Sequence, residues 1–164
     1  MLKEITPRNA ALLVFAVSIL TIIGAWIFEW FGYEPCELCL KQRWAYYAVI
    51  PLSLAVAFIA GQWPLMMRLG LLLVGLVMVA SAIFGLYHAG VEWKWWPGPG
   101  TCEGTLSGGL PKLGTEPVIA CDQAAIRILG LSLAGWNAVI SLCLATVAFL
   151  GARGKHQGSS SVSQ

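Results

Sequence analysis

The chain alternates between long uncharged stretches and short polar segments. Four stretches contain no Asp, Glu, Lys or Arg and have 20, 24, 23 and 25 residues. In chain order they are residues 9–28, 44–67, 69–91 and 128–152. A helix needs about 20 mostly apolar residues to cross a hydrocarbon layer about 30 Å thick. The pattern therefore predicts four membrane-spanning helices, at about residues 10–30, 41–60, 69–87 and 127–150.

The segments between these helices are two loops and a tight turn. Residues 31–40 form a short loop, and "GQWPLMMR" at residues 61–68 is a hairpin turn with a glycine and a proline as helix breakers. Residues 89–126 form a long loop, in which neither "WPGPGTCEG" nor "LSGGLPKLG" can build a spanning helix. We expect residues 1–152 to be a single membrane domain and the Ser-rich tail, residues 153–164, to be disordered.

Composition supports a membrane protein. The chain is 58% hydrophobic and 11% charged, whereas soluble domains have about 25% charged residues. Its formal net charge is +2 and it has no block of Lys and Arg, so nucleic acid is not an expected partner. The first stretch begins like a signal peptide but ends in "AWIFEWFGY", where cleavage would require small residues, so we expect it to be retained. The predicted fold class is an all-α membrane protein, a bundle of four transmembrane helices.

Four spans place both termini on one side of the membrane and the two loops on the other. The loops contain four of the five cysteines, namely Cys36, Cys39, Cys102 and Cys121. Counting Lys and Arg near the helix ends does not orient the protein, because each side has five. Disulfides persist outside the cytosol. We therefore expect the cysteine loops to lie outside and both termini to be cytoplasmic.

The sequence "PCELCLKQR", residues 35–43, contains two cysteines separated by two residues. Such a pair is redox-active, binds zinc or attaches haem, and the leucine after the second cysteine excludes haem attachment. Zinc needs further ligands, but Cys102, Cys121 and His88 lack the spacing of a second zinc-binding pair, so no metal site is predicted. The redox interpretation is favoured, since we place Cys39 at the start of a helix, where unpaired N–H groups stabilise a thiolate.

Arg43 follows Cys39 by four residues, so the two side chains lie on one face of the predicted helix. An arginine at this depth can simply extend to lipid headgroups. We favour a second interpretation, in which the guanidinium binds an anionic or carbonyl-bearing partner beside the thiolate. Ionisable groups near the hydrocarbon layer are commonly functional.

The remaining candidates have less specific interpretations. Cys102 and Cys121 either close a structural disulfide, which would contribute about 3 kcal/mol, or exchange with another protein's thiol. Cys143 lies inside the last helix and is expected to be inert, and His88 ends the third helix, where most histidines are merely solvated. An interfacial belt is expected from Trp26, Trp30, Tyr33, Trp44, Tyr46, Tyr47, Trp93, Trp95 and Trp96.

A redox dithiol needs an electron acceptor. The sequence "GPGTCEG" lacks the spacing of a dinucleotide fingerprint and follows no strand. A membrane quinone needs no nucleotide site and reaches the dithiol through the lipid. Passing electrons from a strong thiol oxidant near about −120 mV to a glutathione-like acceptor near about −200 mV costs several kcal/mol, since 30 mV corresponds to about 1.4 kcal/mol. A quinone is therefore the favoured acceptor.

Three segments resemble the disulfide bond formation protein B (DsbB) family. They are "PCELCLKQR", "GLYHAGVEWKWWPGPGTC" after the third helix, and "CDQAAIRILGLSLAGWN" leading into the fourth, and the similarity covers nearly the whole chain apart from its tails. The resemblance implies a thiol:quinone oxidoreductase of the bacterial inner membrane, with both cysteine loops in the periplasm. Its partners would be a periplasmic thioredoxin-fold oxidase of the DsbA type, the membrane quinone pool and the lipid bilayer, with ubiquinone or menaquinone as cofactor.

The resemblance also implies roles for four catalytic cysteines. Cys102 would receive the thiolate of the partner protein, and Cys121 would then exchange with Cys36. Cys39 would lie closest to the quinone.

The family further implies that Arg43 binds and polarises the quinone and that His88 is a neighbour of the quinone pocket. Two other interpretations remain open. One is a non-enzymatic scaffold stapled by two static disulfides. The other is a quinone reductase of the vitamin K epoxide reductase type, which shares four helices and a C-x-x-C, although its dithiol normally precedes the last helix of the bundle.

Overall fold

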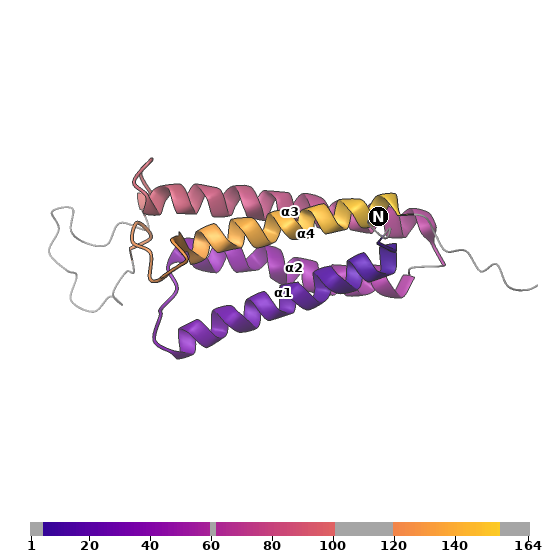
Figure 1. Cartoon of the computed structure of the whole chain (residues 1–164), viewed down its shortest axis with the longest axis horizontal. Coiled ribbons are helices and arrows are strands. Elements are labelled where there is room, and N and C mark those ends of the chain that lie inside the picture. The colour runs from indigo at the N-terminus through magenta and orange to yellow at the C-terminus, as the bar shows by residue number, and fades with distance from the viewer. Residues whose placement is uncertain (1–4, 60–61, 101–119, 155–164) are drawn as a thin grey trace, which may run out of the picture.

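The computed structural model describes residues 5–59, 62–100 and 120–154. Within these residues the chain forms, in order, α1 (Pro7–Trp30), α2 (Glu37–Ile59), α3 (Pro64–Glu92), β1 (Arg127–Ile128), β2 (Leu131–Ser132) and α4 (Leu133–Arg153). The helices run side by side in one elongated bundle (Figure 1). The contact between α3 and α4 is the most extensive, and α1 packs against both α2 and α4. Much of the long loop and the expected tail from residue 155 onward lie outside the described residues.

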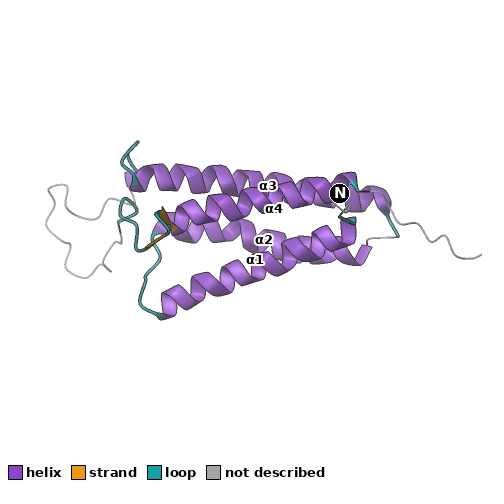
Figure 2. Cartoon of the chain, viewed as in Figure 1, coloured by secondary structure: helices purple, strands orange, loops and turns teal. Residues whose placement is uncertain are grey.

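The bundle has a terminal end and a cysteine end. At the terminal end, the start of α1 meets the end of α4, because a side chain added at Gly151 would collide with Ala10. The cysteine end is formed by the α1–α2 connection, residues 31–36, and by the segment 120–132 with its short hairpin, as Figure 2 shows. α1 diverges from α3 and α4 toward this end (Figure 1).

The interior of the bundle combines small side chains with some large ones, such as Tyr46 and Met78, and many other large apolar side chains face outward. The central cluster draws on all four helices and consists of Val14, Ile22, Tyr46, Val49, Val74, Met78, Leu144, Ala145 and Ala148. Leu20, Phe58, Leu76, Ile83 and Leu142 are between 58% and 74% exposed. Small interior residues let helices approach closely within a membrane, and lipid covers an apolar exterior. Among the described helices, α1, α3 and α4 are long and apolar enough to cross a membrane, so the chain is a membrane protein.

The uncharged run at residues 44–67 overstates the apolar length of α2. Pro64 starts α3, so the run includes the turn between the helices and the first residues of α3. Only residues 44–59 of the run lie in α2, and they extend about 24 Å at 1.5 Å per residue. The preceding turns of α2 are polar and contain Lys41 and Arg43. A fourth membrane span therefore remains a prediction.

Three helices, α1, α2 and α3, begin earlier than expected, because a charged residue near a helix end was taken as the boundary. α1 begins at Pro7 instead of about residue 10, since proline suits the first helical position. The Thr6 hydroxyl also accepts a hydrogen bond of 3.3 Å from the N–H of Asn9. α3 begins at Pro64 instead of about residue 69 and continues to Glu92 instead of residue 87. The proline read as a breaker is thus a helix start.

The expectation of a helix from about residue 127 is wrong, because a hairpin precedes α4. Its two strands are antiparallel and are joined by Leu129 and Gly130, whose φ values are 52° and 83°. Left-handed conformations at both positions define a tight two-residue turn that a helix cannot contain. α4 then begins after Ser132, whose hydroxyl accepts a hydrogen bond of 3.2 Å from the N–H of Gly135, and ends at Arg153 instead of residue 150.

The close contact of α3 with α4 at Gly85 predicts a specific sensitivity to substitution. A Cβ at Gly85 would lie 3.0 Å from the backbone nitrogen of Ala138 and 3.1 Å from the carbonyl oxygen of Ala134. Since both are backbone atoms, α4 itself would have to move, and Gly85→Ala should lower stability by about 1–3 kcal/mol. Thermal unfolding in detergent micelles measures the loss. Gly24→Ala is the matched control, because no heavy atom lies within 4 Å of its added Cβ, and equal losses would contradict this packing.

Candidate functional site

Cys36 is the residue immediately before α2. The helix begins at Glu37 instead of about residue 41 and ends at Ile59, so the C-x-x-C lies at its N-terminus. The backbone N–H of Cys39 donates to Cys36 Sγ at 3.2 Å, and the N–H of Leu40 donates to the Cys36 carbonyl at 3.1 Å. Cys36 thus caps the helix with its sulfur, as a serine or aspartate does with an oxygen. Cys39 lies in the first turn of α2, as expected, but the sulfur that accepts a hydrogen bond from a helical N–H is that of Cys36.

A buried histidine of α3 lies against this sulfur. His88 is 1% exposed, and its Nε2 is 3.6 Å from Cys36 Sγ. Its Nδ1 is 2.8 Å from the amide nitrogen of Gln42. If that amide donates to Nδ1, the ring proton is on Nε2, facing the sulfur. Glu92 Oε1 lies 3.9 Å from the same Nε2.

Cys121 reaches the same place from the other loop. It is fully buried and shares one cluster with Cys36 and Leu38, against which Cys39 and Phe84 pack. Cys121 is disulfide-bonded, whereas Cys36 and Cys39 are free thiols. The fold therefore brings one sulfur of a disulfide into the surroundings of a reduced pair.

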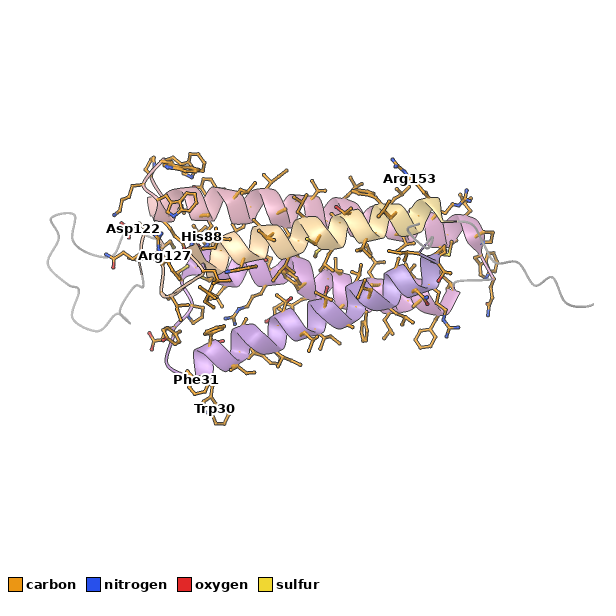
Figure 3. All side chains as sticks on the ribbon, viewed as in Figure 1. Trp30, Phe31, His88, Asp122, Arg127 and Arg153 are labelled. Carbon is orange, nitrogen blue, oxygen red and sulfur yellow. The ribbon has the colours of Figure 1, made fainter. Side chains whose placement is uncertain are left out.

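The residue after Cys121 is anchored by an ion pair. Asp122 Oδ2 lies 2.6 Å from Lys94 Nζ, in the turn that follows α3. His88, Asp122 and Arg127 all lie at the cysteine end of the bundle (Figure 3). The ion pair thus ties the second loop to α3 close to the thiols.

Cys39 lines a cavity of about 120 Å³ between α1, α2 and α4. Its polar lining includes Glu34, Gln42, Arg43, Tyr46 and Asn137, and its apolar lining includes Ile22, Ala25, Phe28, Leu133 and Ala134. An apolar cavity of about 150 Å³ binds benzene. This cavity is therefore close to the size of a single ring.

Arg43 is held at the cavity wall by a residue of α1. Its Nη1 lies 2.8 Å from Glu29 Oε2, and the side chains of Arg43 and Glu29 are 13% and 39% exposed. A guanidinium has five N–H donors, so this ion pair leaves donors for a ligand. The pair joins the end of α1 to the start of α2 and positions the charge at the cavity that Cys39 also lines.

Asn137 of α4 forms part of the cavity wall. It is 8% exposed, and its Nδ2 has no hydrogen-bond partner among the described residues. Its Oδ1 lies 3.5 Å from the hydroxyl of Ser141, which in turn lies 2.9 Å from the hydroxyl of Tyr46. A buried amide without a partner costs free energy, and this nitrogen lies toward α3, 3.0 Å from the position of a Cβ added at Gly85. Tyr46 is 2% exposed, so its expected place in the interfacial belt is wrong.

The structure gathers most of the residues singled out in the sequence. Cys36, Cys39, Cys121, Arg43 and His88 lie together at the cysteine end. His88 contacts Cys36 and is not among the residues that line the cavity.

The other two cysteines lie elsewhere. Cys102 lies in the segment 101–119, outside the described residues. Cys143 is an exposed free thiol on α4.

Four residues near the thiols were missed by the sequence analysis: Glu29, Gln42, Glu92 and Asn137. A local signal existed for each of them. Glu29 and Glu92 are single acidic residues at the ends of long apolar stretches, Gln42 lies inside the C-x-x-C motif segment, and Asn137 interrupts an apolar stretch. Polar residues in such positions are functional candidates in membrane proteins.

The surroundings of Cys36 stabilise its thiolate. Hydrogen bonding from Cys39 and, to a smaller extent, from His88 lowers the pKa of Cys36 to about 5, although burial acts in the opposite direction. An ordinary cysteine has a pKa of about 8.5. Reduced Cys36 is therefore ionised at neutral pH, and the thiolate is the form that reacts in disulfide exchange.

A pH titration of the reduced protein tests this stabilisation. The ultraviolet absorbance of the thiolate should appear with a midpoint near pH 5, because a depressed pKa keeps the thiolate at every pH above it. His88→Ala should move the midpoint upward, since it removes one stabilising contact, and Cys143→Ser should leave it in place. A midpoint near the ordinary value of about 8.5 would contradict the geometry.

Comparison with known proteins identifies the family. The chain matches the family described as "Disulfide bond formation protein DsbB" over residues 7–151. It is also similar to the "Uncharacterized protein RP370" of Rickettsia prowazekii (strain Madrid E), with 28% identity over 151 residues that cover 85% of this chain and 83% of that protein. No solved structure matches the chain. The family match runs from the first turn of α1 to the last turn of α4, and it confirms that the chain belongs to the DsbB family of disulfide bond formation proteins.

Proposed function

We propose that this protein oxidises a periplasmic thioredoxin-fold protein of the DsbA type and passes the electrons to a membrane quinone. Membership of the DsbB family already makes the chain a membrane oxidoreductase of disulfide bond formation. One observation carries the finer proposal: the C-x-x-C lies between two different neighbours. Cys36 shares a buried cluster with the disulfide-bonded Cys121, while Cys39 lines a ring-sized cavity together with Arg43.

The first exchange takes place between the partner and a Cys102–Cys121 disulfide. The partner's thiolate attacks Cys102, forms a mixed disulfide with it and releases Cys121 as a thiolate. The partner's second thiol then closes the partner's own disulfide and leaves Cys102 reduced. Two electrons and two protons have moved from the partner to Cys102 and Cys121.

The second exchange takes place within the cluster that Cys36 and Cys121 share. The Cys121 thiolate attacks Cys36 of a Cys36–Cys39 disulfide, and Cys39 leaves as a thiolate at the cavity that Arg43 also lines. Cys102 then attacks Cys121, which restores their disulfide and frees Cys36. The Cys36 thiolate is stabilised by the N–H of Cys39 and by His88. The product is a reduced C-x-x-C next to a closed outer disulfide.

The cavity beside Cys39 fits the head group of a quinone. When bound, a quinone would accept two electrons and two protons from the reduced pair and leave as the quinol. Arg43 is a donor suited to a carbonyl oxygen, and Phe28 and Leu133 supply apolar contacts for a ring. Ubiquinone and menaquinone both offer the two carbonyl groups that such donors bind.

A fourth span by α2 would complete the topology. Its 23 residues extend about 34 Å, and Trp44, Tyr47 and Phe58 on its surface are exposed. Lys41 is paired with Glu37 at 2.7 Å, which lowers the cost of a charge at the membrane surface. Four spans would place the cysteine end in the periplasm and both termini in the cytoplasm of a bacterial inner membrane.

Electron transfer from the partner to the quinone should need all four cysteines of the relay. With a reduced DsbA-type protein as donor and a soluble quinone analogue as acceptor, serine at Cys36, Cys39, Cys102 or Cys121 should reduce the loss of quinone absorbance to the uncatalysed rate. Cys143→Ser is the control and should stay near the wild-type rate, because this thiol is exposed on the outside of α4. Full activity of Cys39→Ser would contradict the relay. A wild-type protein that leaves the quinone unchanged would favour a non-enzymatic scaffold.

Arg43 should contribute to quinone binding. Arg43→Ala removes a charged hydrogen-bond donor worth about 1.5–3 kcal/mol, so the KM for the quinone analogue should rise about 10- to 100-fold. Lys41→Ala is the matched control, since Lys41 lies two residues away on α2 and its side chain is paired with Glu37 instead of lining the cavity. Steady-state kinetics with varied quinone measure both variants. An unchanged KM in Arg43→Ala would remove this role.

A further inference from the structure

Three atoms that can bind a metal converge where α2 begins and α3 ends. Cys36 Sγ, Cys39 Sγ and an imidazole nitrogen of His88 all lie within 4.8 Å of one another. The sequence argued against zinc because no second ligand pair has the right spacing. The fold supplies the third ligand from a distant part of the chain.

The spacing of these atoms suits a tetrahedral zinc ion. Zn–S bonds of about 2.3 Å and Zn–N bonds of about 2.0–2.1 Å at the tetrahedral angle separate sulfur from nitrogen by about 3.6 Å. The distance from Cys36 Sγ to His88 Nε2 is 3.6 Å. These two ligands therefore already have the separation that a bound ion requires.

Glu92, one turn further along α3, is the candidate for a fourth ligand. Its Oε1 lies 3.9 Å from His88 Nε2. The residue is 9% exposed, and its Oε2 has no hydrogen-bond partner among the described residues. A buried carboxylate oxygen without a partner is costly, and a cation held by His88 would satisfy it.

Gln42 can orient the histidine as a ligand. A histidine that binds metal through one ring nitrogen donates its other N–H to an oxygen acceptor. The Gln42 amide lies 2.8 Å from Nδ1, and a half-turn of this amide presents its oxygen to that position. Nε2 is then free to bind the ion.

Access and charge also suit a divalent cation. Cys39 lines the cavity beside α2, which gives an ion a route to the buried sulfur of Cys36. The charge of Arg43, nearby on α2, is paired with Glu29 at 2.8 Å. Two thiolates and one carboxylate together offset the charge of the ion.

We propose that the reduced Cys36–Cys39 pair forms, with His88 and Glu92, a binding site for Zn²⁺ or the chemically similar Cd²⁺. Binding forms two metal–sulfur bonds and releases the remaining thiol protons to solvent, and no electrons move. The disulfide form has no thiolates, so the site exists only in the reduced protein. A bound ion keeps both sulfurs from closing their disulfide and thus blocks the oxidase. The inhibition of the oxidase rests on the proposed function, whereas the binding of the metal ion does not.

Cobalt spectroscopy of the full chain tests the binding without quinone or partner. The protein in detergent is reduced with a phosphine, which contributes no competing thiol, and is titrated with Co²⁺. Tetrahedral cobalt with thiolate ligands should give intense visible bands and a sulfur-to-cobalt charge-transfer band, saturating at one ion per chain and lost on addition of Zn²⁺. No such bands in the reduced protein, or equal bands in the oxidised protein, would overturn the proposal.

Variants of the ligands locate the ion. Cys36→Ser and Cys39→Ser should each weaken the charge-transfer band, and His88→Ala and Glu92→Gln should each change the visible bands and weaken binding. An unchanged spectrum and affinity in either His88→Ala or Glu92→Gln would overturn the four-ligand site. Cys143→Ser is the control and should bind as the wild type does. Thermal unfolding of each variant in detergent separates lost ligands from lost fold.

Two further measurements complete the test. Gln42 positions His88 and does not bind the ion. Gln42→Leu should therefore weaken cobalt binding about 10- to 100-fold while keeping the tetrahedral spectrum. Zn²⁺ should inhibit quinone reduction in the wild type, with recovery on chelation. Cobalt binding without any quinone reduction would support the metal site and contradict the proposed function. Quinone reduction without cobalt binding would support the proposed function and contradict the metal site.

Discussion

The site depends on the contact between the start of α2 and the end of α3. Cys36 lies at the N-cap of α2, so its sulfur accepts a helical N–H, and His88 of α3 lies against the same sulfur. Both interactions favour a thiolate in a place that is closed to water. If α2 began one turn later, Cys36 would lie in a loop and would lose its hydrogen bond from the helix backbone. The position of a helix start thus sets the chemistry of the dithiol.

The two sulfurs of the pair have different surroundings although they are three residues apart. Cys36 is buried with Cys121, which belongs to the second loop, and Cys39 borders the cavity between α1, α2 and α4. A dithiol with the same neighbours on both sides has no direction of transfer. Here one sulfur shares a cluster with a disulfide-bonded cysteine and the other lines a ring-sized cavity together with Arg43, so the proposed relay has a distinct entry and exit.

The bundle keeps its polar groups inside because its outside is apolar. A buried polar group cannot reach water, so it must find a partner within the protein. The hydroxyls of Tyr46 in α2 and Ser81 in α3 each form a hydrogen bond with the hydroxyl of Ser141 in α4. The amide nitrogen of Asn137 and one oxygen of Glu92 are without partners among the described residues. The second of these, the oxygen of Glu92, belongs to the metal site proposed at His88.

The sequence by itself determined the class of protein and its reactive core. Long uncharged stretches predict membrane helices, because a membrane requires uninterrupted apolar length. The C-x-x-C and Arg43 are local features, and their spacing in the sequence is enough to place them on one face of a helix. Only the tertiary structure decided where the helices begin and which distant residues meet the motif, such as His88 at Cys36 and Glu29 at Arg43. Caps and turns override the boundaries that charges suggest, and helices apolar on every face have no periodic pattern that marks the inward side.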